Sequence, residues 1–232
     1  GRALMEALPD LTVTLSADIL PEFKEYDRMS TTAMNAYIGP VVARYLRRLQ
    51  DAISADGISS DLHVMQSSGG IIGAVTAAER PVQTILSGPA AGVIGGVAIA
   101  GQTGEANLIS IDMGGTSFDI CLTYDSEIGR SREREIEGFP IKVASVDIHT
   151  LGAGGGSIAW IDAGGALRVG PQSAGAEPGP ACYARGGQEP TVTDANLVLG
   201  RLGTDSFLGG EMALDLERAR YAVDVGVAGP LG

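Results

Sequence analysis

The chain has 232 residues, of which 44% are hydrophobic and 19% are charged, a globular composition that excludes wholesale disorder. With 16 Lys and Arg against 28 Asp and Glu, the net charge of −12 argues against a surface for nucleic acid or an anionic membrane. The cysteines Cys121 and Cys182 form no CxxC pair, so they support neither a disulfide scaffold nor a structural zinc site. No signal-peptide pattern and no membrane-length apolar stretch is visible, and we expect a soluble cytoplasmic protein.

Helices dominate the predicted N-terminal part. Leu11 to Leu15 alternates apolar and polar residues and predicts a half-buried strand. Residues 30–55 carry apolar side chains at three- and four-residue spacing and predict a long helix. Pro40 lies inside this pattern and either kinks the helix or starts a second one. The arginines at 44, 47 and 48 are interpreted as a solvated helix face.

Strands become more frequent after a run of small residues at 89–100. Apolar segments predict strands at 108–111, 117–124 and 141–146, and a hairpin is predicted from 157–161 and 166–169. Helices are expected at 191–202, closed by Gly203, and at 214–223. Trp160 is expected in the core. The fold class is therefore α/β, with mixed rather than strictly alternating elements.

The most informative segment for chemistry is Asp112-Met113-Gly114-Gly115-Thr116, a tight connection between two predicted strands. Two glycines at such a tip let backbone N–H groups point outward together, which makes a concavity suited to phosphate oxygens. Thr116 adds a hydroxyl group, and Asp112 supplies a hard oxygen ligand for the magnesium ion of a nucleotide. The alternative from spacing alone is an ordinary hairpin turn.

Further candidates surround this segment in the sequence. Asp119 is a candidate catalytic residue that acts on phosphate-bound water or metal, or it caps the turn. Asp147 and His149 share one face of an extended strand and are candidate metal ligands together with a distant carboxylate such as Asp194; a structural hydrogen-bonded pair is the alternative. Asp194 also fits the first turn of a helix, where a carboxylate is stabilised. Cys182 is a candidate nucleophile or a structural thiol.

The glycine loop 152–156 contains four glycines in five positions. Gly152, Gly154, Gly155 and Gly156 are therefore candidates for a second backbone surface that faces nucleotide or substrate. No Walker A pattern occurs, and the loop is a poor Rossmann fingerprint because its last glycine position is Ser157 and a strand follows.

The stretch IDMGGTSFDI at 111–120 resembles the second phosphate motif of the actin, sugar-kinase and heat-shock chaperone ATPase superfamily. More closely, the chain resembles the hydantoinase A/5-oxoprolinase family. The segments that carry this resemblance are EYDRMSTTAMNAYIGP (25–40), MQSSGGI (65–71), SGPAAGVIGG (87–96), IDMGGTSFDI (111–120), HTLGAGGGSIAW (149–160), GAEPGPACY (175–183) and PTVTDANLVLGRL (190–202).

The resemblance implies an actin-like ATPase (ribonuclease H-like) lobe, a mixed sheet with flanking helices, which uses ATP and Mg²⁺ to open a cyclic amide such as 5-oxoproline or a hydantoin. Ring opening is implied to proceed by phosphorylation of the carbonyl oxygen before hydrolysis. A hydantoinase B-type subunit or domain is the implied partner. Relatives also serve in ATP-dependent ketone carboxylases, which keeps that reaction open, and a non-catalytic nucleotide-binding module is a third reading.

The superfamily holds nucleotide between two lobes, and only one DxGGT-type segment occurs in this sequence, which begins abruptly at Gly1. We therefore expect residues 1–232 to be a single hydantoinase A-type domain from the central part of a longer polypeptide. A subdivision into a helix-rich part, 1–104, and a β-rich part with the phosphate loop, 105–232, is also expected. The isolated fragment is expected to be inactive.

Overall fold

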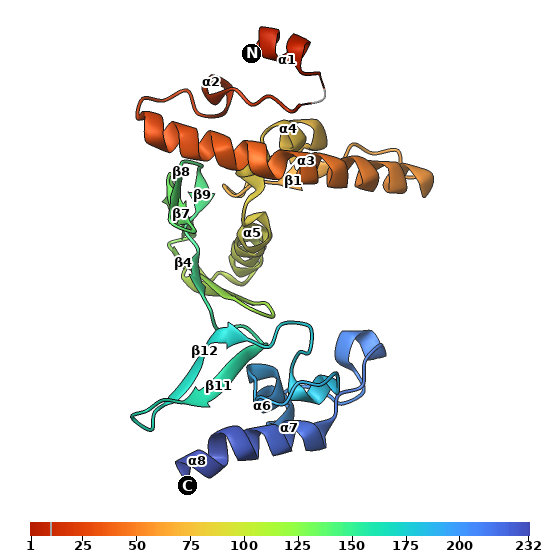
Figure 1. Cartoon of the computed structure of the whole chain (residues 1–232), viewed down its shortest axis with the longest axis vertical. Coiled ribbons are helices and arrows are strands. Elements are labelled where there is room, and N and C mark those ends of the chain that lie inside the picture. The colour runs from red at the N-terminus through yellow and green to blue at the C-terminus, as the bar shows by residue number, and fades with distance from the viewer. Residues whose placement is uncertain (10) are drawn as a thin grey trace. The chain divides into compact units, whose positions relative to one another are not determined.

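The computed structural model describes residues 1–9 and 11–232 (Figure 1). Contacts divide the chain into two compact units. Unit 1 comprises residues 1–110 and 121–148, and unit 2 comprises residues 111–120 and 149–232. Each unit therefore takes part of the hairpin that contains the DMGGT segment. None of the described helices is long and apolar enough to cross a membrane.

Unit 1 contains most of the helical residues. Its helices are α1 (Arg2–Ala7), α2 (Ser16–Ile19), α3 (Glu25–Ala55), α4 (Ala74–Glu79), the 3₁₀-helix η1 (Pro81–Thr84) and α5 (Ser87–Thr103). Its short strands are β1 (His63–Met65), β2 (Ile71–Gly73), β5 (Glu127–Ile128), β6 (Arg130–Ser131), β7 (Arg134–Ile136), β8 (Phe139–Ile141) and β9 (Ser145–Val146). The pairs β1–β2, β6–β9 and β7–β8 are antiparallel.

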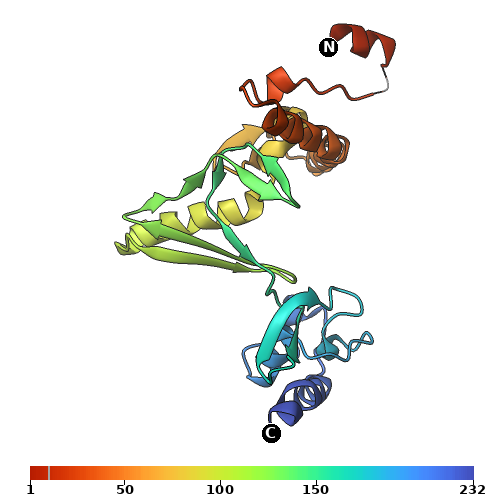
Figure 2. The same ribbon diagram turned by 60° about the vertical axis from the view of Figure 1, so that its left-hand side comes forward.

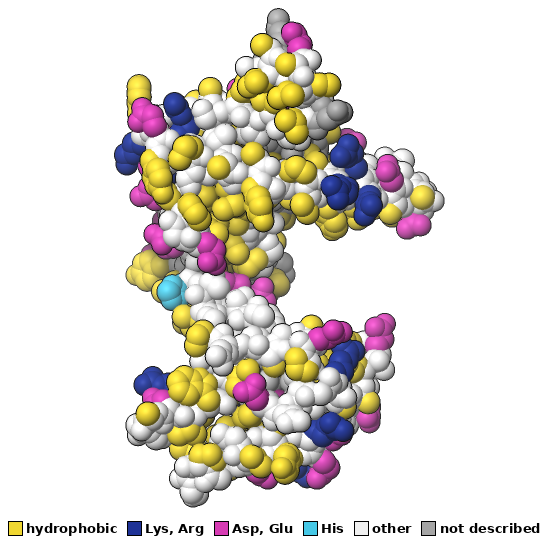
Figure 3. Space-filling view, in the orientation of Figure 1, with side chains coloured by type: hydrophobic (Ala, Val, Ile, Leu, Met, Phe, Trp, Pro, Cys, Tyr) yellow, Lys and Arg dark blue, Asp and Glu magenta, His cyan; other side chains and the backbone are white. Residues whose placement is uncertain are grey.

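The long helix α3 confirms the apolar periodicity in the sequence. It runs without interruption through Pro40, so a second helix starting there is wrong. The buried Asn35 side chain bonds the carbonyl of Glu79 at 3.1 Å and the N–H of Val82 at 3.2 Å, which fixes α3 to α4 and η1. Lys and Arg side chains gather over the C-terminal half of α3 (Figure 3), where Arg44, Arg47 and Arg48 are exposed, in agreement with a solvated face.

The small-residue run forms α5, which packs against the strands that lead to the hairpin tip. Ala90 and Val93 of α5 join Cys121, Val146 and Ile148 in one buried cluster. A methyl group on Gly96 would lie 3.2 Å from the Ser110 hydroxyl, so the glycine keeps the helix close to the neighbouring strand. Figure 2 shows α5 alongside these strands.

The hairpin is built from β3 (Leu108–Met113) and β4 (Phe118–Tyr124), which are neighbours in a four-stranded sheet with β10 (His149–Leu151) on the other side of β4. The strand β5 also pairs with β4. Both strands predicted around the DMGGT segment are thereby confirmed.

Unit 2 continues with a hairpin and a small helical cluster. Its further elements are β11 (Ser157–Ile161), β12 (Leu167–Ser173), the 3₁₀-helices η2 (Ala181–Tyr183) and η3 (Phe207–Gly210), α6 (Val192–Val198), α7 (Leu216–Val223), the π-helical turn η4 (Asp224–Ala228) and α8 (Gly229–Leu231). The helix α6 contacts both β11 and α7 (Figure 2). The core of this unit consists of Cys182, Leu197, Leu214 and Ala219.

Three local predictions need correction. Leu11 to Leu15 is irregular and leads into α2, because within the described residues no strand pairs with it and an unpaired strand leaves its backbone unsatisfied. The strand predicted at 141–146 is two separate pieces, the end of β8 and β9, each with its own partner. The helix predicted to run to Leu202 ends at Val198, followed by Gly200 with a φ of +69°.

Candidate phosphate-binding site

The DMGGT segment forms the exposed tip of the β3–β4 hairpin. The N–H of Gly114 donates to the carbonyl of Ser117 at 2.9 Å and closes the turn. Asp112, near the end of β3, is exposed, and so are Gly114, Gly115 and Thr116. The tip is thus not covered by packed side chains, and its groups are accessible to a ligand.

The backbone donors at the tip are not all used by the fold. In residues 1–9 and 11–232, no hydrogen bond engages the N–H of Gly115 or of Thr116. Adjacent backbone N–H groups on an exposed turn are an anion-binding feature, because they carry partial positive charge and no competing acceptor. The tip therefore offers two neighbouring donors and the Thr116 hydroxyl to phosphate oxygens.

The glycine loop 152–156 lies directly against this tip. The N–H of Gly155 donates to the carbonyl of Gly114 at 2.8 Å, and the N–H of Gly156 donates to the carbonyl of Gly115 at 2.6 Å. Gly154 and Gly156 are buried, whereas Gly152 is exposed. The structure thus joins the two glycine-rich segments that the sequence marked separately. Direct contact of the loop with nucleotide stays a prediction.

The other side of the loop is held by α6. The carbonyl of Gly155 accepts hydrogen bonds from both the N–H and the hydroxyl of Thr193, each at 2.8 Å. The carbonyl of Gly156 accepts one from the N–H of Ala174 at 2.8 Å. Because the loop is bonded on both sides, it is a fixed support for the tip.

Asp119 lies on β4 opposite Thr150 of β10. The Thr150 hydroxyl donates to Oδ1 of Asp119 at 2.5 Å, so this carboxylate is held by a side chain of the neighbouring strand. It is half-buried. The second carboxylate oxygen makes no hydrogen bond within the described part of the chain and is available to a water molecule or a metal ion.

The candidate metal ligands are distributed over both units. Asp112 and His149 belong to unit 2, and Asp147 belongs to unit 1. His149 is an exposed residue of β10 opposite Ile120, and Asp147 is also exposed. Among the described residues, no group of three or more His, Cys, Asp or Glu could hold a metal ion. The ligand set of Asp112, Asp147 and His149 stays a prediction.

Asp194 is a structural carboxylate rather than an open ligand. Its side chain is fully buried and completes a capping box with Thr191 at the start of α6. It also accepts hydrogen bonds from the N–H groups of Ala181 at 3.2 Å and Cys182 at 2.8 Å. The sequence identified the helix position but held no signal for these two longer-range contacts.

The Cys182 thiol is buried at the same point. Burial and the adjacent Asp194 carboxylate raise its pKa far above the ordinary thiol value of 9.0, so the thiol stays protonated. A protonated, inaccessible thiol is a poor nucleophile. The structural interpretation of Cys182 is the one that the geometry supports.

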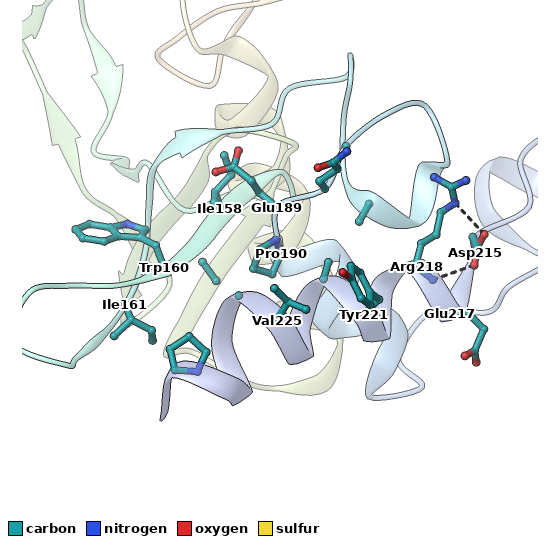
Figure 4. Close-up of a pocket in the computed structure, with 17 residues that line it drawn as sticks. Ile158, Trp160, Ile161, Glu189, Pro190, Asp215, Glu217, Arg218, Tyr221 and Val225 are labelled. Atoms are coloured by element: carbon teal, nitrogen blue, oxygen red, sulfur yellow. Dashed lines mark hydrogen bonds and ion pairs between the residues drawn. The ribbon is translucent and has the colours of Figure 1, made fainter. Parts of the chain in front are cut away.

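A second concave site lies elsewhere in unit 2, between β11 and the α7–η4 segment (Figure 4). This cavity of about 1050 Å³ is lined by Trp160, Pro190, Tyr221 and Val225, with Arg218 paired to Asp215 at its edge. Trp160 is 44% exposed, so its assignment to the core is wrong. No described residue of 111–120 or 152–156 lines this cavity.

A sequence model of the hydantoinase/oxoprolinase family matches residues 28–232. Because the match covers most of the chain, the protein belongs to the hydantoinase/oxoprolinase family, as the resemblance predicted. The chain is 45% identical over 226 residues to the caprolactamase subunit alpha of Pseudomonas jessenii, which covers 97% of this chain and 32% of that protein.

Two solved structures are similar along the whole chain. The crystal structure of the ATP-dependent caprolactamase from Pseudomonas jessenii superposes with a TM-score of 0.77 at 44% identity, covering 100% of this chain and 34% of that one. Nucleotide-free acetone carboxylase, described for ATP-dependent acetone carboxylation, gives 0.80 at 32% identity, covering 100% and 32%. The predicted actin-like ATPase type of α/β fold is confirmed. The chain spans about a third of the length of each relative.

Proposed function

We propose that the chain supplies the phosphate-binding lobe of an ATP-dependent hydrolase that opens cyclic amides. The observation that carries the proposal is the exposed hairpin tip, which offers two adjacent backbone donors and the Thr116 hydroxyl and follows the exposed Asp112 closely in the sequence. Phosphoryl transfer requires mainly positioning and charge neutralisation, so such a tip suffices without a catalytic triad. Similarity to a caprolactamase, whose name describes a cyclic-amide hydrolase, supports this substrate class.

The donor atoms at the tip fit Mg²⁺. Magnesium prefers oxygen ligands and is bound by one or two carboxylates together with substrate phosphates, so it does not require a cluster of several acidic side chains. Asp112 provides an exposed carboxylate near the end of β3, the strand that leads to the proposed phosphate site. We assign the magnesium contact to Asp112, directly or through water. The bound ion would neutralise charge on the phosphates.

The proposed reaction balances as a phosphorylation followed by hydrolysis. The carbonyl oxygen of the cyclic amide attacks the γ-phosphorus, the bond to the β-phosphate oxygen breaks, and ADP leaves. Water then adds to the activated carbon, and the C–N bond of the tetrahedral adduct breaks, which leaves an amine and an acyl phosphate. A second water molecule hydrolyses the acyl phosphate to a carboxylate and inorganic phosphate. In this scheme the N–H groups of Gly115 and Thr116 hold the phosphate, and Asp119 orients the attacking group.

The test uses the complete protein with its partner subunits. ADP and phosphate release are measured with caprolactam, 5-oxoproline and hydantoins, each with the wild type and with Asp112→Ala. Ring opening coupled to ADP release in the wild type, and its loss in the variant, would support the proposal. Equal turnover in Asp112→Ala would contradict the site assignment.

The second candidate is a subunit of a ketone carboxylase, since the structural match to acetone carboxylase is equally close in shape. We rank the carboxylase function second because the chain is 44% identical to the caprolactamase and 32% identical to acetone carboxylase. ADP release with a ketone and bicarbonate, and none with the cyclic amides, would reverse the order. ATP binding without turnover on any of these substrates would leave the third reading, a nucleotide-binding module.

The remaining assignments follow from the family. We propose a hydantoinase B-type subunit or domain as the partner, which agrees with the relative being named as one subunit of an enzyme. We further propose that residues 1–232 are one hydantoinase A-type domain of a longer cytoplasmic polypeptide, with a helix-rich part, 1–104, and a β-rich part that carries the phosphate loop, 105–232. Co-purification of the complete protein with a B-type subunit from cell extract tests the first of these.

A further inference from the structure

At Gly154 the glycine loop packs against the hairpin tip with no room for a side chain. A methyl group built on this residue would lie 2.5 Å from the backbone nitrogen of Thr116 and 2.6 Å from backbone atoms of both Gly115 and Ser117. Such distances are far inside van der Waals contact, and the atoms met are backbone atoms that cannot rotate away. Only glycine at this position lets the two backbones touch.

Neighbouring Gly152 is different. A methyl group there would meet only Pro171, at 3.9 Å, which is an ordinary contact. The lack of space at Gly154 is therefore not a general property of the glycine loop. Of these two glycines, only Gly154, where the loop meets the backbone of the tip, leaves no room for a methyl group.

The close approach also aligns the hydrogen bonds between the two segments. With Gly154 in place, the N–H groups of Gly155 and Gly156 reach the carbonyls of Gly114 and Gly115. The bonded carbonyls of Gly114 and Gly115 fix the orientation of the peptide groups at the tip. Among the described residues, the N–H groups of Gly115 and Thr116 have no acceptor. A displaced loop would release these carbonyls and let the tip peptides rotate.

We infer that Gly154 is a positioning residue: it lets the glycine loop clamp the hairpin tip, so that the Gly115 and Thr116 amides stay aimed at phosphate. The inference rests on the proposed function of the tip. In this arrangement the loop acts on nucleotide through the tip, since its Gly155 and Gly156 donors are already engaged. Thr193 of α6 holds the glycine loop in this position, because its hydroxyl donates a hydrogen bond to the carbonyl of Gly155.

The experiment compares Gly154→Ala with Gly73→Ala, whose added methyl group would meet no atom within 4 Å, in the complete protein with its partner. Amide hydrogen exchange is measured on peptides that cover 111–120 and 152–158, and ATP kinetics are measured in parallel. We expect faster exchange at Gly155 and Gly156 and a loss of about 10-fold or more in kcat/KM for ATP in Gly154→Ala. Gly73→Ala should resemble the wild type in both measurements.

Thr193 provides a milder pair of variants that does not depend on how well Gly154→Ala folds. Thr193→Val removes the hydroxyl donor at nearly constant shape, and Thr193→Ser retains it. We expect Thr193→Val to raise the KM for ATP and the exchange rate of the loop, and Thr193→Ser to restore both. A purely structural role would lower thermal stability without this recovery of ATP affinity by serine.

Unchanged exchange in Gly154→Ala and Thr193→Val would overturn the clamp. Faster exchange without any change in ATP kinetics would overturn the positioning role, provided that substitutions at the tip itself impair ATP use. If tip variants such as Asp112→Ala also leave ATP turnover intact, the proposed function of the tip fails first. The exchange data then still decide whether the clamp exists.

Discussion

The N–H of Gly156 donates a 2.6 Å hydrogen bond to the carbonyl oxygen of Gly115, although the two glycines are far apart in the sequence. This bond and its neighbour from Gly155 to Gly114 connect the loop after β10 to the turn after β3. The accessible amides of Gly115 and Thr116 thereby belong to a turn whose backbone is held by the glycine loop.

Gly115→Ala tests the phosphate contact with little cost to the fold. A methyl group at 115 would meet no atom within 4 Å, and the residue is not in the left-handed region. Unfolding free energy should change by less than about 1 kcal/mol, while the methyl group on the exposed tip obstructs a phosphate. We expect kcat/KM for ATP to fall about 10- to 100-fold. Gly73→Ala, equally unhindered but remote in the sequence, should not lower it; wild-type ATP kinetics in Gly115→Ala would contradict the site.

Asp119→Asn tests the second carboxylate. The amide oxygen of Asn can still accept the Thr150 hydrogen bond, so the strand pairing should persist. If the charge orients the attacking group, kcat should drop about 100-fold with a much smaller change in the KM for ATP. Steady-state kinetics of the complete enzyme provide the measurement. A normal kcat would leave Asp119 with only a structural role, its hydrogen bond to Thr150 of the neighbouring strand.

Removal of magnesium tests the role of Asp112. Chelation by EDTA should abolish ADP release, and readdition of Mg²⁺ should restore it. In Asp112→Asn, the Mg²⁺ concentration that gives half-maximal turnover should rise about 10-fold or more. Asp205→Asn alters another exposed carboxylate and serves as the matched control. Identical magnesium titrations for both variants would show that Asp112 does not contact the ion.

Asp194→Asn tests the buried carboxylate as a stabilising element. Asn replaces one acceptor oxygen by an NH₂ group, which then faces N–H donors that the carboxylate had satisfied. We expect a loss of about 3 kcal/mol in unfolding free energy. Asp215→Asn changes the cap of α7, where Asn is an equally good cap, and should cost less than about 1 kcal/mol. Urea unfolding of the two variants provides the comparison, and equal losses would contradict this assignment.

The buried Cys182 thiol predicts a loss of stability at alkaline pH. Its pKa is raised in the folded state by burial and by Asp194, so the folded protein retains a proton that the unfolded chain releases above pH 9.0. This contribution is fully present below the unfolded pKa and decreases as pH rises through it, by at most about 1.4 kcal/mol per pH unit. Urea unfolding from about pH 8 to about pH 10 should show a shallower decrease in Cys182→Ala. An equal slope would contradict the prediction.

Local sequence patterns predicted the elements whose partners are close in the chain. The apolar runs on both sides of DMGGT indicated the β3–β4 hairpin, and the turn residues at 162–165 between two predicted strands indicated β11 and β12. The apolar spacing correctly predicted one long helix α3 in spite of Pro40. The other turns of this helix are intact, and Asn35 bonds it to the end of α4. The residues of the DMGGT segment could be selected as a candidate site because they are adjacent in the sequence.

Long-range packing decided what the patterns left undetermined. The sequence shows the glycines at 152–156, but their partner is a distant turn, and no local rule connects Gly154 with Thr116. The alternation at Leu11 to Leu15 suggested a strand, yet a strand also needs a neighbour, which local pattern does not supply. The sequence likewise indicated Asp194 as a residue at the start of a helix. Its bonds to Ala181 and Cys182 depend on the packing of η2 against α6, which no local pattern specifies.

The insertion of residues 111–120 into the middle of unit 1 along the chain has a consequence for anyone who wishes to shorten this polypeptide. A truncated gene that starts at His149 would encode the glycine loop without the carbonyls of Gly114 and Gly115, and β10 without its neighbour β4. Expressing unit 2 alone therefore calls for grafting the β3–β4 tip onto it by a new covalent linker, not for a simple cut.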